Sequence, residues 1–268
     1  PIGNNVSAVE TDYAIINIDR IRVPSQSIGK FSEQRTAMNY MALARDRVGH
    51  RYGVLVDEML FQAASGVSYT LKPNGASRGA QSQFASYRFA ADVTAPSTNR
   101  KIFAGTATST ATLTATDTMN WNLLLRAKAF AEYHRISPIM YKGEETYIIV
   151  MHTHQGEDLK RDPDYKAALA HADKQGDQNK LFTGMLASVD GLILYTHPKV
   201  CSNYGGTLWG SGNTVYGAQA LLLGAQALAY AQIGEMEEIK PDQTDWGSRD
   251  GVGVDCTIGI LKPQFSRA

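Results

Sequence analysis

The sequence predicts a mixed fold of the α+β class, in which helices and strands both contribute to the core. Three observations lead to this prediction. Residues 32–65 have the apolar spacing of a long helix, the short apolar runs at 146–152 and 192–196 are typical of buried strands, and residues 252–260 alternate as a strand does. The 268 residues, 43% of them hydrophobic, are enough for one large ordered domain or two small ones.

The overall charge excludes some classes of partner. There are 26 basic and 26 acidic side chains, so the formal charge is zero. A neutral chain without a long basic run has no net attraction to nucleic acid or to an anionic membrane. No apolar run reaches the length of a membrane span, and we expect no membrane partner. The two cysteines, Cys201 and Cys256, are interpreted as small buried thiols, with a single bridge between them as the alternative.

The start of the chain is expected to have little core of its own. Residues 1–12 are polar and are interpreted as an arm or linker. Residues 13–23 alternate like a half-exposed strand, and residues 24–30 supply turn residues. The charged members of this strand are Asp19, Arg20 and Arg22. Because an isolated two-stranded hairpin is marginally stable in water, we expect another molecule to support this part.

Residues 32–65 are interpreted as one unusually long helix. Apolar residues recur three or four positions apart along a single narrow stripe, formed by Met38, Met41, Val48, Tyr52, Leu55 and Met59. Gly66 is placed to end the helix. A helix of this length spans roughly 48 Å and is expected to be a spine along which other elements lie. The alternative is two helices broken near Gly49 or Gly53.

Residues 66–118 are rich in Ser, Thr, Ala, Gly and Asn, with a few strand-like pieces such as 87–93. Little in this stretch favours a core, and a loop this long inside a compact domain is usually functional or disordered. We therefore expect a long excursion over the surface.

The rest of the chain alternates predicted helices and strands. Helices are expected at 118–135, 162–172 and 217–233. Strands are expected at 146–152, 192–196 and 252–260, after an extended stretch at 136–140 and with a Gly-rich loop at 203–213. Asp117 is placed to cap the first helix, and Pro163 suits the first turn of the second. The third is apolar nearly all round, which predicts a helix buried between layers.

The sequence offers few groups for chemistry. A phosphate-binding loop, a serine elbow and the helical zinc motif of metalloproteases are all absent. His152 and His154 are two positions apart at a predicted strand, and residues with this spacing share one strand face, so both imidazoles could bind a metal. The alternative without a metal is two partly exposed histidines at the end of the strand. His197 is also interpreted as a strand-end residue. We expect no enzyme activity and no cofactor, with a metal-dependent hydrolase using His152 and His154 as one alternative. A carbohydrate-binding or adhesive surface protein built on residues 66–118 is another.

Five segments, in order, carry a resemblance to a known family. They are KFSEQRTAMN at 30–39, the AP-x-x-x-R and AG pattern at 95–105, KGEETYIIVMHTHQGEDLKRD at 142–162, NKLFTGMLASVDGLILYTH at 179–197 and GAQALLLGAQA at 217–227. With them the chain resembles, over residues 13–265, the major capsid proteins of tailed bacteriophages, in the family related to the coat protein of phage N-four.

This resemblance implies a Hong Kong 97-like capsid fold. By analogy, residues 1–12 resemble the remnant of an N-terminal arm, and residues 13–31 resemble the extended loop that lies on a neighbouring subunit. Residues 32–135 and 236–268 resemble the peripheral domain, with its spine helix and a long surface insertion. Residues 136–235 resemble the axial domain.

The implied function is a major capsid protein that assembles with copies of itself into the icosahedral shell around the double-stranded DNA of a tailed bacteriophage. The implied partners are copies in hexamers and pentamers, portal, scaffolding and decoration proteins, and packaged DNA held weakly and non-specifically. The implied place is the virion, assembled in the host cytoplasm. The residues expected to contact a neighbouring subunit are Asp19, Arg20, Arg22, Lys30, Glu33 and Arg35.

Overall fold

The computed structural model describes residues 13–27, 29, 34–35, 40–80, 82–141, 143–172, 188–239 and 249–263. Its elements in chain order are β1 (Asp19–Gln26), α2 (Tyr40–Ser65), the 3-10 helices η2 (Phe84–Ser86), η3 (Arg88–Asp92) and η4 (Thr98–Arg100), α3 (Trp121–Tyr133), β2 (Ile139–Tyr141), β3 (Glu144–Met151), α4 (Thr153–Arg161), α5 (Pro163–Ala172), β4 (Ser188–Val189), β5 (Leu192–Thr196), β6 (Leu221–Leu223), β7 (Ala229–Ile239) and β8 (Gly251–Leu261).

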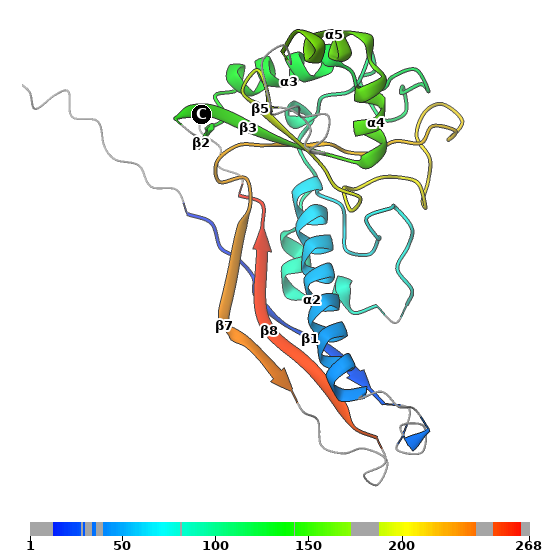
Figure 1. Cartoon of the computed structure of the whole chain (residues 1–268), viewed down its shortest axis with the longest axis vertical. Helices are drawn as coiled ribbons and strands as arrows, with labels where there is room; N and C mark the ends of the chain where they lie inside the picture. The colour runs from blue at the N-terminus through cyan, green and yellow to red at the C-terminus, as the bar shows by residue number, and fades with distance from the viewer. Residues whose placement is uncertain are drawn as a thin grey trace, which may run out of the picture.

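The strands form two separate sheets, and the predicted α+β class is confirmed. One sheet has three antiparallel strands in the order β1-β8-β7, so the last strand of the chain lies in its centre. The other has the order β2-β3-β5-β4, with β6 also paired to β3; its β3–β5 pair is parallel and its other pairs are antiparallel. Figure 1 shows the first sheet beside the long helix α2, and β3 and β5 together with α3, α4 and α5 at the other end of the molecule.

Each sheet has its own hydrophobic core. The first core joins α2, β1, β8 and the segment after α2, and its fully buried members include Ile21, Met59, Tyr69, Phe89 and Ile258. The second core joins β3 and β5 to helices α3, α4 and α5, and includes Leu124, Met151, Leu159, Tyr165 and Leu194. The protein therefore consists of two packed bodies, which are connected along α2.

Helix α2 is unbroken through Gly49 and Gly53, so the alternative of two helices is wrong. A Cβ atom at either glycine would meet nothing within 4 Å, so these positions face open space and packing on the opposite side holds the helix together. The helix ends where predicted. Gly66 has a φ of +71°, and a Cβ there would lie 2.4 Å from the carbonyl oxygen of Thr94. Most of the expected first turns, 32–39, lie outside the described residues.

Several local predictions are confirmed. The strands predicted at 146–152, 192–196 and 252–260 are β3, β5 and β8, and the helix predicted at 162–172 is α5. Helix α3 is shorter than predicted, and its cap is Asn120, whose side-chain oxygen accepts a hydrogen bond from the Leu123 N–H at 2.9 Å. The predicted cap, Asp117, instead accepts two hydrogen bonds from Thr114.

The predicted helix at 217–233 is wrong. Residues Leu221–Leu223 form β6 against β3, and Ala229–Ile239 form β7 against β8. A run that is apolar on every side fits a buried strand as well as a helix, and only the available partner decides between them. The small residue Gly224 serves close packing, because a Cβ there would lie 2.6 Å from Ile136 Cγ2 and from the Ser137 carbonyl oxygen.

Three further predictions need correction. The piece at 87–93, predicted to be strand-like, forms the 3-10 helix η3 instead. Helix α4 was missed, because no helix was predicted at 153–161. The expectation that the start of the chain has little core of its own is wrong for Asp19–Gln26. This segment pairs over its whole length with β8 of the same chain, and Ile21 and Val23 are buried in the first core. The excursion at 66–118 is irregular as predicted, since its described residues form one isolated bridge and short 3-10 helices. The expectation that little in it favours a core is wrong, because Tyr69 and Phe89 are fully buried in the first core.

Candidate functional site

The outer sheet face is the side of β1-β8-β7 that is turned away from α2. Side chains alternate along a strand, so Arg20 and Arg22 lie on this face while Ile21 and Val23 point into the first core. Both arginines bond to Asp255 of β8: Arg22 Nε donates to Asp255 Oδ2 at 3.2 Å, and Arg20 forms an ion pair with the same oxygen. Only 3% of the Asp255 side chain is exposed, against 53% and 60% for the two arginine side chains.

This cluster stays ionised at neutral pH. Burial acts to raise the pKa of Asp255, but Arg20 and Arg22 outweigh that effect and hold the pKa below its ordinary value. The arginines cover the carboxylate while their own outer parts remain in solvent. The two residues that we predicted as subunit contacts therefore already have a partner within the chain, and only part of each guanidinium is open to another molecule.

Of the other four predicted contact residues, the structure describes Asp19 and Arg35. The Asp19 carboxylate accepts hydrogen bonds from the backbone N–H groups of Arg20 at 2.7 Å and Arg88 at 2.9 Å, and so ties β1 to η3. Arg35 is exposed. Lys30 and Glu33 lie outside the described residues.

Two shallow depressions lie on the outer sheet face. One of about 210 Å³ is lined by Arg20, Ile233 and Glu237 among others. The other, of about 340 Å³, includes Pro24, Ile239 and Gly253 in its lining. Neither is an enclosed cavity of the kind that buries a small molecule.

Residues 13–18 lie across the same body as an anchored extended segment. The backbone N–H and side-chain amide of Asn17 donate to the Asp92 carboxylate at 2.9 and 2.6 Å. Ile16 packs closely over Gly259, because a Cβ atom added at Gly259 would lie 2.8 Å from the Cγ2 atom of Ile16. Tyr13 and Ile15 have no such cover and are 87% and 76% exposed. The segment is fixed to its own chain and presents large apolar side chains outwards.

Exposed large apolar side chains occur on both bodies. On the first body they are Tyr13, Ile15, Leu43, Tyr230, Ile233 and Met236. On the second they are Leu125, Tyr133, Met140, Tyr141, Tyr195 and Tyr216. Single exposed apolar residues are ordinary, but groups of them indicate surfaces that other molecules cover.

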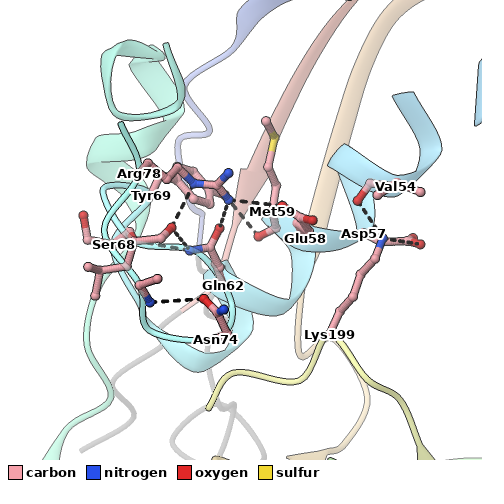
Figure 2. Close-up of polar contacts among 12 residues, drawn as sticks. Val54, Asp57, Glu58, Met59, Gln62, Ser68, Tyr69, Asn74, Arg78 and Lys199 are labelled. Atoms are coloured by element: carbon pink, nitrogen blue, oxygen red, sulfur yellow. Dashed lines mark hydrogen bonds and ion pairs between the residues drawn. The ribbon is translucent and has the colours of Figure 1, made fainter. Parts of the chain in front are cut away.

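The two bodies meet at a joint, which we define as the C-terminal half of α2 with the loops 68–78 and 197–206. Lys199 Nζ donates to the Val54 carbonyl oxygen at 2.8 Å and lies 3.6 Å from Asp57 Oδ2 (Figure 2). The Ser202 and Gly205 N–H groups donate to the carbonyl oxygens of Pro73 and Asn74, each at 2.7 Å. Bonds from the loop after β5 thus hold both α2 and the loop that follows it.

A buried polar network fixes the end of α2 at this joint. The Gln62 side chain is fully buried, and its Nε2 donates to the carbonyl oxygens of Ser68 at 3.3 Å and Leu71 at 2.7 Å. Arg78 donates to Gln62 Oε1, Glu58 Oε2 and the Leu71 carbonyl oxygen, as Figure 2 shows in part. Both polar atoms of the buried Gln62 side chain therefore have partners, which is the condition for such a network to stabilise the fold.

Histidines line the other side of the joint. His152 caps α4: its Nδ1 accepts from the His154 N–H at 3.3 Å, and its own N–H donates to the Gln155 side chain. His197 directly follows β5, as predicted for a strand-end residue, and stacks on Phe61 of α2 with ring centroids 4.7 Å apart. Burial lowers the pKa of both His152 and His197, so both are neutral at neutral pH.

Sequence reasoning did not find the joint. Val54 and Lys199 are 145 positions apart, and neither belongs to a motif. It also did not foresee the pairing of Arg22 with Asp255, 233 positions later. The only signal was a single carboxylate in an otherwise apolar and small-residue strand, which indicates a buried group that needs a partner.

The structure gives no support to a metal site or a membrane span. Within the described ranges, no three His, Cys, Asp or Glu side chains are grouped so that they could hold a metal ion. His154 lies instead on the first turn of α4, 3.8 Å from Glu157. Cys201 and Cys256 are both buried and unlinked. None of the helices in the described part of the chain combines the length and apolarity needed to cross a bilayer.

Comparison with known proteins gives a consistent result. The family model described as phage capsid protein matches residues 3–268. A major capsid protein of Pseudomonas phage KPP25 is 34% identical over 272 residues, which cover 97% of this chain and 72% of the relative. The capsid of Ralstonia phage GP4 superposes with a TM-score of 0.73 at 26% identity, over 94% of this chain and 70% of that one. The capsid of cyanophage Pam1 shares the fold, with a TM-score of 0.71 at 19% identity over 99% and 77% of the two chains.

Proposed function

This chain belongs to the phage capsid protein family, and we propose that it builds its shell through the exposed apolar groups on its two bodies. It is a major capsid protein, which forms the capsid shell of a tailed phage, and it is not an enzyme. The observation that carries this conclusion is the family match over nearly the whole chain. That match overturns the two alternatives considered from sequence, a metal-dependent hydrolase using His152 and His154 and a carbohydrate-binding surface protein.

The finer features of the shell are proposals. We infer an icosahedral shell of hexamers and pentamers around double-stranded DNA, assembled in the host cytoplasm, with portal, scaffolding and decoration proteins as further partners. Contact with the packaged DNA is expected to be weak and non-specific, since the chain has no net charge. The self-assembly of the chain into shells can be tested by measuring the size of the expressed protein by light scattering and imaging it by electron microscopy. Closed particles of many copies are expected, whereas a monomer or trimer at every concentration would contradict it.

The fold resembles phage capsid structures, and we propose a division into Hong Kong 97-like domains that follows the two bodies. In this proposal α2 is the spine helix and the first body is the peripheral domain. The second body is the axial domain. Because β7 pairs with β8 from Ala229 onwards, the boundary is better drawn between β6 and β7 than at residue 235. Residues 1–12 remain proposed as an arm remnant.

The proposed subunit contacts start from the outer sheet face. Ile233 and Met236 of β7 are 60% and 53% exposed, at the free edge of the sheet. An unpaired edge with apolar side chains invites association, and Glu235, Glu237 and Glu238 on the same strand oppose pairing with a second acidic edge. We therefore propose that a different surface of the neighbouring copy covers this strand. The six residues predicted from sequence, Asp19, Arg20, Arg22, Lys30, Glu33 and Arg35, remain proposed contacts beside it.

The double variant Ile233→Asp, Met236→Asp tests this surface. We expect it to lower the yield of shells at least tenfold, because covering two new carboxylates costs well above the roughly 1.4 kcal/mol that a tenfold change requires. The melting temperature of the unassembled chain should change little, since both side chains already face solvent. The matched control is Ala111→Asp, which adds a carboxylate at an exposed position of the irregular segment 66–118, outside both apolar groups. Normal shells from the double variant would contradict the proposed contact.

A further inference from the structure

Two histidines, the buried His152 and the half-buried His197, occupy equivalent places at one edge of the second sheet. His152 follows Met151, the last residue of β3, and His197 follows Thr196, the last residue of β5. These strands are parallel neighbours in which Met151 is opposite Thr196, so both histidines emerge at the same edge. That edge borders the joint between the two bodies.

Both imidazoles use Nδ1 as a hydrogen-bond acceptor. His152 Nδ1 accepts from the His154 N–H at 3.3 Å, and His197 Nδ1 accepts from the Lys199 N–H at 3.2 Å. A neutral imidazole has one acceptor nitrogen, whereas a protonated one has two donors and no acceptor. Protonation would therefore break the cap of α4 at the first site and the turn that leads into Lys199 at the second.

The second turn supports the contact with α2. His197 stacks on Phe61, and Lys199 reaches the Val54 carbonyl oxygen and the Asp57 carboxylate. Cys201, two residues further on, bonds to the Phe61 carbonyl oxygen at 3.8 Å. Loss of the turn at His197 would displace the residues that connect the second body to the helix of the first.

The groups around each histidine have different charges. His152 faces the rings of His154 and Tyr204, each at a centroid distance of 5.2 Å, and His154 in turn lies near Glu157. Charge repulsion between the two imidazoles makes His154 oppose protonation of His152, and a backbone hydrogen bond with Pro198 favours it. Around His197, Asp57 favours the charged form and Lys199 opposes it. In both cases burial is the largest influence, and it favours the neutral form.

We propose that His152 and His197 form a pH-sensitive brace, which holds the two bodies together while both imidazoles are neutral and loosens when they take up protons.

The direction of the pH dependence follows from the lowered pKa values of His152 and His197. The pKa of each histidine lies below its ordinary value of 6.5 in the folded chain, so the opened joint binds protons first as the pH falls. Above about pH 6.5 the two states bind equal numbers of protons and the brace is fully effective. As the pH falls below that value, the closed joint loses stability. At pH 5.5 the opening constant rises by up to about tenfold for each histidine.

Hydrogen exchange of the purified chain at pH 7.5 and 5.5, corrected for intrinsic rates, tests this inference. We expect faster exchange at the lower pH in peptides covering 54–65 and 197–206, and unchanged protection in β8. The double variant His152→Asn, His197→Asn should abolish the pH effect, because an asparagine side chain can accept the same N–H two residues on but does not titrate. The matched control His50→Asn, at an exposed position of α2, should retain it.

An equal pH response in the double variant and in the unaltered chain would overturn the proposal. A second measurement does not depend on the variant's folding. Titration of the imidazole signals by nuclear magnetic resonance should place the pKa of His152 and of His197 below the ordinary histidine value of 6.5 in the unaltered chain, and ordinary values for both would also overturn the proposal. Neither measurement requires shells, so this inference and the proposed assembly surface are tested separately.

Discussion

The two bodies of this protein are assembled from the sequence in different ways. The first joins β1 near the start of the described chain to β7 and β8 near its end, around the long helix α2. The second is built mainly from residues 119–223, with three helices packed on a sheet (Figure 1). Both sheets have a central strand with partners along its two edges, β8 in the first and β3 in the second. In the described part of the first body, the outer sheet face carries the half-exposed arginines of β1 and the exposed Ile233 of β7, whereas helices α3, α4 and α5 pack on the second sheet.

The comparison also concerns how the bodies are coupled. The joint supplies backbone bonds, an ion pair and a buried polar network at one end of α2. Such a joint predicts that the two bodies unfold together, although each has its own core. The predictions below test this from the largest expected effect to the smallest.

The largest effect is expected from a cavity in either core. Ile258→Ala in β8 and Leu194→Ala in β5 remove buried side chains, and each should destabilise the chain by about 2–5 kcal/mol. If the joint couples the bodies, calorimetry will show a single transition at a lower temperature for both variants. Ile258→Val is the mild control, at about 0.5–1.5 kcal/mol. A second transition that keeps the original midpoint would show that the bodies unfold independently.

A smaller effect is expected at the charged cluster of the outer sheet face. Asp255→Asn keeps the shape of the side chain but removes the charge that Arg20 and Arg22 contact. We expect a loss of about 2–4 °C in Tm at pH 7, corresponding to about 1 kcal/mol, and a smaller loss in high salt because the arginines are half-exposed.

The pH dependence of this variant has a definite sign. The pKa of Asp255 is lowered in the folded chain, so its stabilisation is present above its ordinary value of 3.8 and is lost as the pH falls below it. The Tm difference between Asp255→Asn and the unaltered chain should therefore shrink below about pH 3.8. Asp46→Asn, at an exposed site on α2, is the control. A constant difference down to pH 2 would contradict the assigned pairing.

The smallest effect is expected at the open face of α2. Gly49→Ala and Gly53→Ala should each raise stability by up to about 1 kcal/mol, because alanine favours the helix and the added methyl group meets nothing within 4 Å. Gly66→Ala is the opposite control, since its φ of +71° and the nearby Thr94 carbonyl leave no room for a side chain. Thermal melts measure all three. A more stable chain that no longer forms shells would place a neighbouring copy against this open face.

Local patterns determined a definite part of this protein. Some features depend only on residues that are close in sequence, and the spacing of those residues was sufficient to predict them. They are the end of α2 at Gly66, the start of α5 at Pro163 and the strands β3, β5 and β8. The five ordered motifs were sufficient to identify the capsid family.

Other features depended on residues that only the tertiary structure brings together. Within residues 217–233, the segments 221–223 and 229–233 became parts of strands because β3 and β8 offered edges, although the apolar pattern alone equally fits a buried helix. Arg22 found its partner in Asp255, and Lys199 found its partner on α2, across 233 and 145 positions of sequence. The physical reason is that spacing along the chain specifies which face of an element is apolar, whereas the partner of an edge or a charge is selected by long-range packing.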